Sequence, residues 1–184
     1  MYACTVAASL ALLAAPAPAS LILALDLPAM AQRADAVAVV EVTSARAAWD
    51  SAHQRILSTI EVAVVESWKG SPAPATRITI RQPGGTVGDV TMVVSGMPRF
   101  SLGERALVFL QGPAERATVV GMAQGKRAIH RDPAGSGRWL VDPPERAGAS
   151  YVGASVAAPE QWARRPLDEV RAQVRDLVAR ARAR

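Results

Sequence analysis

The stretch that decides the fold is Arg55-Ile-Leu-Ser-Thr-Ile-Glu-Val-Ala-Val-Val-Glu-Ser-Trp68. Side chains in it alternate between two faces, as they do along a β-strand, where the period is two residues. One face carries Ile56, Ser58, Ile60, Val62 and Val64, and the other carries Arg55, Thr59, Glu61 and Ser67. We therefore expect a strand whose even-numbered face lies in the core.

Shorter strands are expected on both sides of this stretch, because runs of β-branched residues alternate with Gly and Pro. They cover residues 36–43, 77–81, 90–94, 105–110, 118–122, 126–130 and 138–141. The first is almost continuously apolar, which is typical of a strand buried on both faces. Five to eight short strands at regular spacing predict a mainly β fold, a small antiparallel OB-like β-barrel or, alternatively, a sandwich.

A helix is expected at each end of this β domain. Residues 26–34 form a short helix, with Asp26 as its cap and Pro28 in its first turn. Residues 166–184 form an amphipathic helix, with an apolar stripe of Leu167, Val170, Val174, Leu177 and Val178. This helix either docks on the barrel or lies on an anionic membrane. Docking is favoured, because the stripe contains no Trp or Phe.

The N-terminal segment has the pattern of an export signal. Residues 1–25 carry no charged side chain, and Ala17-Pro18-Ala19 supplies the small residues that signal peptidase recognises. Cleavage there would make Ser20 the mature N-terminus. The alternative is an uncleaved anchor, which Pro16 and Pro18 disfavour because proline interrupts a helix. We expect a periplasmic or secreted protein of a Gram-negative-type bacterium.

The domain organisation follows from these segments. Residues 1–19 are the signal peptide, and residues 20–145 are the β-barrel domain with its short N-terminal helix. Residues 146–165 are a connector rich in Gly, Ala, Ser and Pro, and residues 166–184 are the C-terminal helix. The mature chain would contain no disulfide, because Cys4 is the only cysteine.

Charge and composition argue against a nucleic-acid partner. The net charge is +5, but all of the 21 basic residues except Lys69 and Lys126 are Arg, and seven of these Arg lie between residues 160 and 184. Such a charge run is typical of a solvated helix face. Aromatic residues make up only 4% of the chain and are scattered, so a base-stacking surface is not expected.

No motif in the sequence identifies an enzyme. Residues 121–126 resemble a phosphate-binding loop, but the spacing is one residue short and Arg127 stands where Ser or Thr is needed. His53 and His130 lack metal ligands at the usual spacing, so no metal and no cofactor are expected. A Ser-His-Asp triad stays open, because triads assemble in space.

Loops between rigid strands are where binding residues usually lie. Gly, Pro and polar residues concentrate in three such loops, at residues 83–85, 96–103 and 124–126. The alternative is that these glycines only permit tight turns. The candidate partner-binding patch consists of Arg81, Gln82, Glu104, Gln124 and Lys126.

Six short motifs follow one another along the chain: Arg33-Ala-Asp35, Trp68-Lys69-Gly70, Arg81-Gln-Pro-Gly-Gly85, Pro98-Arg-Phe-Ser-Leu-Gly-Glu104, Leu107-Val-Phe-Leu110 and Gln124-Gly-Lys126. Their order resembles a group of uncharacterised exported bacterial proteins with OB-type, netrin-like barrels, the kind also seen in tissue inhibitors of metalloproteinases. The inhibitors act through an N-terminal Cys that chelates zinc, and the mature chain has none, so that mechanism does not carry over.

The resulting expectation is an exported, non-enzymatic β-barrel module that binds a protein or a cell-surface glycan, with no membrane insertion after cleavage. Two alternatives remain open. One is a protease-inhibitor or enzyme-accessory module that acts through its loops. The other is a hydrolase with an unrecognised triad.

Overall fold

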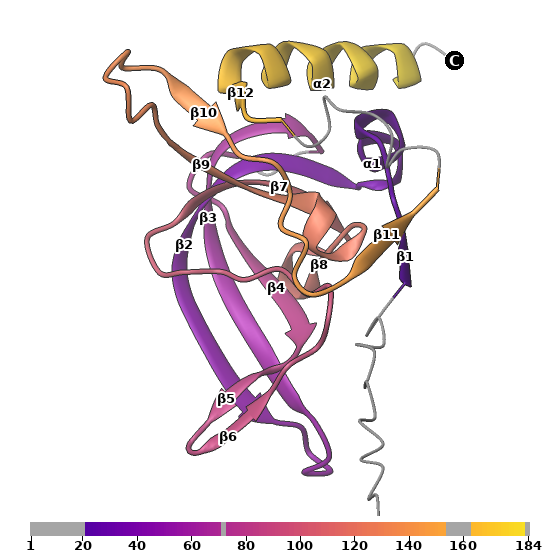
Figure 1. Cartoon of the computed structure of the whole chain (residues 1–184), viewed down its shortest axis with the longest axis vertical. Coiled ribbons are helices and arrows are strands. Elements are labelled where there is room, and N and C mark those ends of the chain that lie inside the picture. The colour runs from indigo at the N-terminus through magenta and orange to yellow at the C-terminus, as the bar shows by residue number, and fades with distance from the viewer. Residues whose placement is uncertain (1–20, 71–72, 154–162, 183–184) are drawn as a thin grey trace, which may run out of the picture.

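The computed structural model describes residues 21–70, 73–153 and 163–182, and it is a mainly β structure with two helices (Figure 1). The strands are β1 (Leu21–Leu23), β2 (Ala36–Trp49), β3 (Ile56–Lys69), β4 (Arg77–Pro83), β5 (Gly85–Val87), β6 (Val90–Met92), β7 (Arg105–Gln111), β8 (Thr118–Val119), β9 (Lys126–Arg131), β10 (Trp139–Val141), β11 (Ser150–Val152) and β12 (Arg165–Pro166). The helices are α1 (Leu27–Arg33) and α2 (Leu167–Arg182), with short 3-10 turns η1 (Ala114–Arg116) and η2 (Met122–Gly125).

A large antiparallel sheet forms the body of the molecule. Its order is β12-β10-β9-β7-β2-β3-β4, and β8 pairs with β7. Two small sheets accompany it, the parallel pair β1-β11 and the hairpin β5-β6. The part of the chain described here contains no closed barrel of strands, but Ala117 bridges to Ile80 of β4 just before β8 pairs with β7. Residues 117–119 therefore lie between β4 and β7.

The long hairpin of β2 and β3 confirms the strand expected at residues 55–68. Ile60, Val62 and Val64 are buried, whereas Thr59 and Glu61 are only half-buried. β2 continues to Trp49, beyond the end expected at residue 43. Pairing with β3 extends it through three alanines, which have low strand propensity by themselves.

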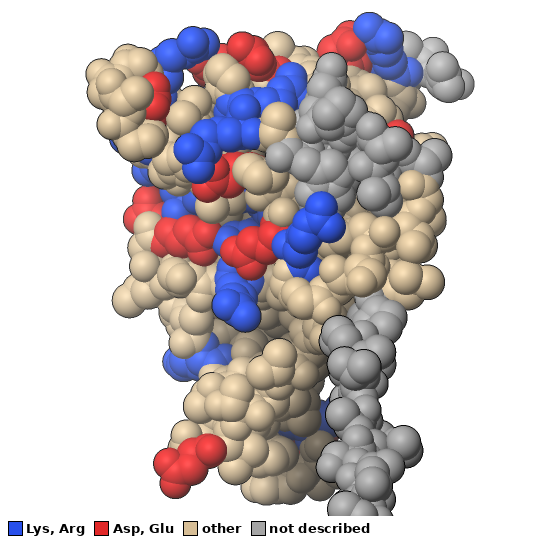
Figure 2. Space-filling model, viewed as in Figure 1, with Lys and Arg blue, Asp and Glu red and all other residues tan. Residues whose placement is uncertain are grey.

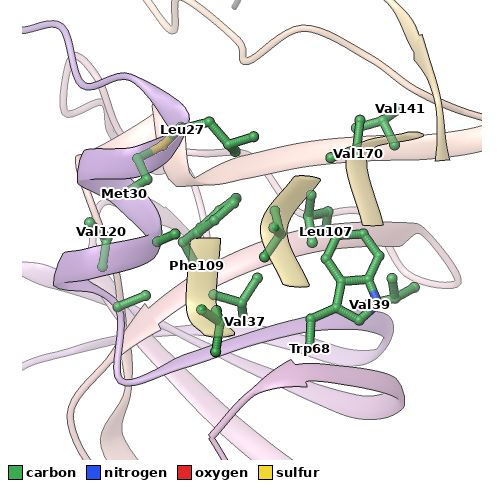
Figure 3. Close-up of a cluster of buried hydrophobic side chains, with 14 of the residues drawn as sticks. Leu27, Met30, Val37, Val39, Trp68, Leu107, Phe109, Val120, Val141 and Val170 are labelled. Atoms are coloured by element: carbon green, nitrogen blue, oxygen red, sulfur yellow. The ribbon is translucent and has the colours of Figure 1, made fainter. Parts of the chain in front are cut away.

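Both faces of the sheet are buried, which explains the continuous apolar run at the start of β2. The inner cluster lies on β2, β3, β4 and β7: Ala38, Val40, Val42, Ile60, Val62, Val64, Ile78, Ile80, Ala106, Val108, Leu110 and Ala117. On the outer face, Val37, Leu107 and Phe109 pack against Met30 of α1 and Val170 of α2 (Figure 3).

The two helices lie where their sequence patterns place them. The Asp26 carboxylate accepts a hydrogen bond from the Ala29 amide at 2.8 Å, and it caps α1 as expected. Lys69 Nζ donates to the carbonyls of Ala31 and Ala34 at 2.8 and 2.6 Å, so a cation satisfies the other end of α1.

Helix α2 docks on the outer face of the sheet, as the favoured alternative predicted. Val170 and Val174 are fully buried, and Leu177 is partly buried against the same cluster. Arg171 and Arg175 both form ion pairs with Glu66 of β3 at 3.0 Å. The helix therefore buries its apolar stripe on the protein itself.

Three segments differ from the sequence expectation. The strand expected at residues 118–122 ends at Val119, because Gly121 takes a left-handed conformation (φ 66°) and η2 follows. The connector expected at residues 146–165 contains β11, which pairs with β1, and β12. The strand expected at residues 90–94 is limited to β6, and its partner β5 begins at Gly85, which was expected as part of the break at residues 83–85.

Candidate functional site

Gln124 is a buried structural residue and does not present a free side chain. It is 0% exposed. Its Oε1 accepts a hydrogen bond from the Leu25 amide at 2.8 Å, and its Nε2 donates to the carbonyls of Leu23 and Gly121 at 3.0 and 3.1 Å. Gln124 thus connects η2 to the N-terminal segment. The expectation that Gln124 belongs to an exposed patch is therefore wrong, because its side chain is buried and its polar atoms are paired within the protein.

Lys126 is also buried, and it lies beside Glu104. Its ammonium donates to Glu104 Oε1, lies 3.4 Å from Glu145 Oε1, and sits 5.6 Å from the Phe100 ring centroid. The second Glu104 oxygen accepts a hydrogen bond from the Ser101 amide at 3.0 Å. Sequence reasoning placed Glu104 and Lys126 in one patch, and the fold does bring them together. They form an ion pair, however, because a buried ammonium requires a counter-charge.

Arg81 and Gln82 point in different directions on β4. Arg81 is exposed and pairs across the sheet with Thr59. Gln82 Nε2 donates to the Pro98 carbonyl at 2.8 Å, and its buried Oε1 has no hydrogen-bond partner among the described residues. The five predicted residues therefore do not form one exposed patch. Gln82, Glu104 and Lys126 instead hold the loop at residues 96–104 in place.

That loop forms one wall of a groove of about 560 Å³. The inner face of the β2-β3 hairpin forms its base, and β4, β5 and β6 contribute the remaining sides. The lining residues are Ala45, Arg46, Ala47, Ser58, Ile60, Gln82, Pro83, Gly84, Gly85, Thr86, Met92, Val93, Val94, Met97, Pro98, Arg99, Phe100 and Ser101. Two of the three loops expected to carry binding residues, 83–85 and 96–103, thus meet at one site. The contribution of β2 was missed, because its strand pattern fades after residue 43.

Gly85 lets β5 cross closely over the hairpin at the side of the groove. Its φ is +133°, and a Cβ at this position would lie 2.6 Å from Ser58 Oγ and 2.7 Å from Ala47 Cβ. Ser58 Oγ also donates a 2.6 Å hydrogen bond to the Gly84 carbonyl. A side chain at residue 85 would therefore push β5 away and change the shape of the groove.

The groove combines apolar walls with one free positive charge. Val93 is 78% exposed, and Ile60, Met97 and Phe100 add further apolar surface. Arg99 is exposed and forms no ion pair among the described residues. The Arg46 guanidinium instead binds Glu61 at 3.2 Å, on the opposite face of the hairpin. No Asp or Glu lines the groove in this part of the chain.

The two histidines lie outside the groove. His130 Nδ1 lies 3.2 Å from Asp142 Oδ2, and Asp142 also binds Arg164 at 2.7 Å. His53 stacks on Trp49 with ring centroids 5.8 Å apart. Within residues 21–70, 73–153 and 163–182, neither histidine forms a hydrogen bond to a serine, and no group of three or more His, Cys, Asp or Glu could hold a metal ion.

The comparisons with known proteins add no family to this description. No protein-family model, no curated protein and no solved structure matches the chain. Neither helix among the described residues is long and apolar enough to cross a membrane.

Proposed function

We propose that this chain is an exported, non-enzymatic binding module built on an OB-like β-barrel, and that it binds a protein partner through the groove. The observation that carries the proposal is the meeting of the β4-β5 junction at residues 83–85 and the loop at residues 96–104 over the β2-β3 hairpin. Binding loops held on a stable sheet are a common arrangement.

The barrel assignment is supported by two features of the sheet. Ala117 exchanges backbone hydrogen bonds of 2.9 Å with Thr79 and Arg81 of β4, and the next two residues pair with β7. The inner apolar cluster lies on β2, β3, β4 and β7, and Ala117 belongs to it. Both features suit a curled sheet of the OB or netrin-like kind, although such a fold hosts many functions.

A protein partner suits the groove better than a glycan. The groove offers one exposed valine, Val93, the half-buried side chains of Met92 and Met97, one aromatic ring and one free arginine. Sugar sites usually need several polar side chains and carboxylates that bond to hydroxyl groups. Apolar surface with an arginine at its rim is instead typical of protein interfaces. An inhibitor or accessory module would use the same surface, since both act by binding a protein.

The proposal can be tested by partner capture with matched variants. Residues 20–184 are immobilised and exposed to periplasmic and secreted extracts of the bacterium that makes the protein. We expect Arg99→Glu to lose a partner that the wild type retains, because the charge at the groove is reversed. Arg116→Glu is the control, since Arg116 is exposed on η1 and does not line the groove. Equal retention by all three proteins would contradict a role for the groove.

A further inference from the structure

One edge of β2 is left open beside the groove. From Ala36 to Glu41, β2 lies between β3 and β7. At Val42 the backbone still exchanges 2.9 Å hydrogen bonds with Glu104 and Gly103. From residue 43 to residue 49, β2 pairs with β3 alone, and no described backbone group bonds to its other edge. An open edge of this kind is a template for another strand.

The register identifies which backbone groups are free. The Asp50 amide donates to the Arg55 carbonyl at 2.8 Å, so this pair faces inward across the hairpin. Hydrogen-bonded pairs alternate along an antiparallel ladder. Ala48 and Arg46 therefore bond to β3, whereas Ala45, Ala47 and Trp49 direct their N–H and C=O groups away from it.

Proline, β-bulges and charged side chains usually block an exposed strand edge, and none of them blocks residues 45–49 of β2. β2 contains no proline, and its register shifts all lie before Ser44. Ala45 and Ala47 have small side chains and both line the groove. Arg46, the one charged side chain between residues 43 and 49, is turned toward Glu61 on the opposite face. A polypeptide can therefore approach this edge from the groove.

The surroundings of the edge indicate the chemistry of the occupant. Val93 and Leu102 are 78% and 74% exposed, and Val90 is 48% exposed. Figure 2 shows that charged side chains gather in the upper half of this face, while the lower part, where β5 and β6 lie in Figure 1, carries few. Arg99 is the free charge at the groove. A second copy that docked through the same groove would set a second Arg99 against the first, and no Asp or Glu lines the groove to pair with either, so a second copy suits the groove poorly.

We propose that the partner binds as an extended, acidic segment of another protein that adds as a strand to residues 45–49 of β2. Backbone hydrogen bonds to Ala45, Ala47 and Trp49 supply affinity, as in other cases of strand addition. Alternate side chains of the segment enter the groove against Val93 and Phe100, and a carboxylate pairs with Arg99. This inference rests on the proposed function, because it specifies how the groove is used.

The test begins with a phage-displayed library of random linear dodecapeptides, panned on residues 20–184 and counter-selected on Arg99→Glu. We expect enriched sequences that alternate β-branched residues with Asp or Glu. The best peptide is then synthesised in two forms, with backbone N-methyl groups at alternate positions in one register or in the other. One form removes the donors that face β2, and the other keeps them.

Strand addition predicts that one N-methylated form binds at least tenfold more weakly, while the other binds as the parent peptide does. Equal affinities of the two forms would overturn strand addition and leave groove binding intact. An enrichment of Lys-rich peptides, or of none, would overturn the acidic extended partner, while partner capture sensitive to Arg99→Glu would still support the proposed function. A dimer in sedimentation that is lost with Ala47→Pro, while circular dichroism and the unfolding midpoint stay unchanged, would assign the edge to a second copy instead.

Discussion

Lys126 donates a hydrogen bond to Glu104 from a side chain that is 2% exposed, whereas the Glu104 side chain is 18% exposed. The pair joins the start of β9 to the loop that forms one wall of the groove, and Glu104 in turn accepts a hydrogen bond from the Ser101 amide. The two side chains therefore differ in their access to water. Glu104 can be hydrated if Lys126 is removed, but Lys126 has little access to water if Glu104 is removed.

This difference in access to water predicts which of two substitutions lowers the free energy of unfolding more. Glu104→Ala leaves a buried ammonium with only Glu145, at 3.4 Å, and should lower the free energy of unfolding by about 3 kcal/mol. Lys126→Met keeps the volume of the side chain and should have a smaller effect, about 1 kcal/mol. Urea denaturation of both variants measures the difference. The opposite order would mean that Lys126 is more hydrated than its burial indicates.

The two faces of β3 should respond differently to the same substitution. Ile60 is 2% exposed in the inner cluster, so Ile60→Asp would bury a carboxylate without a partner and destabilise the fold by several kcal/mol. Thr59 is half-buried on the other face and pairs with Arg46 on one side and Arg81 on the other. Thr59→Asp should therefore be mild. Thermal unfolding followed by circular dichroism compares them, and equal losses would refute the assignment of faces.

Arg127 is a buried cation whose removal should stabilise the protein. Its Nε and Nη2 have no hydrogen-bond partner among the described residues, and burial, with Arg165 nearby, lowers its pKa to about 10. The group stays charged at neutral pH. Arg127→Met should raise the free energy of unfolding by about 1–3 kcal/mol, because the unpaired polar atoms are replaced by an apolar chain of similar length.

The control for this prediction is Arg116→Met at an exposed position, which should change stability by less than about 0.5 kcal/mol. Chemical denaturation of the three proteins gives the comparison. A loss of stability in Arg127→Met would contradict the prediction.

Export with cleavage after Ala19 predicts a mature protein that begins at Ser20. The signal segment itself lies outside the described residues. Cleavage at this site would leave β1 complete, because that strand begins at Leu21. N-terminal sequencing of the protein from the periplasm or medium is the measurement. Recovery of intact Met1 in the membrane fraction would instead support an uncleaved anchor.

Local signals predicted much of the fold. The alternation in residues 55–68, the Asp26 cap and the stripe from Leu167 to Val178 each reflect side-chain periodicity or a hydrogen bond within a few residues. Such features are independent of distant partners, and the structure confirms them. The β4-β5 junction at residues 83–85 and the loop at residues 96–103 were also identifiable, since Gly and Pro mark them directly.

The candidate site was only partly predictable, because its residues depend on contacts between distant segments. Lys126 and Gln124 look like surface residues in sequence, but partners at Glu104 and Leu25 make their burial possible. β2 continues past residue 43 only because β3 pairs with it. The base of the groove follows from that pairing.

The sequence by itself therefore determined the strand and helix patterns, the turn positions and the amphipathic character of α2. The tertiary structure alone decided which polar residues are buried in pairs and which edge of β2 stays open. The physical reason is that periodicity and capping act over a few residues. Burial and strand pairing instead depend on which parts of the chain meet, and the free energy of a charged or backbone group depends on those neighbours.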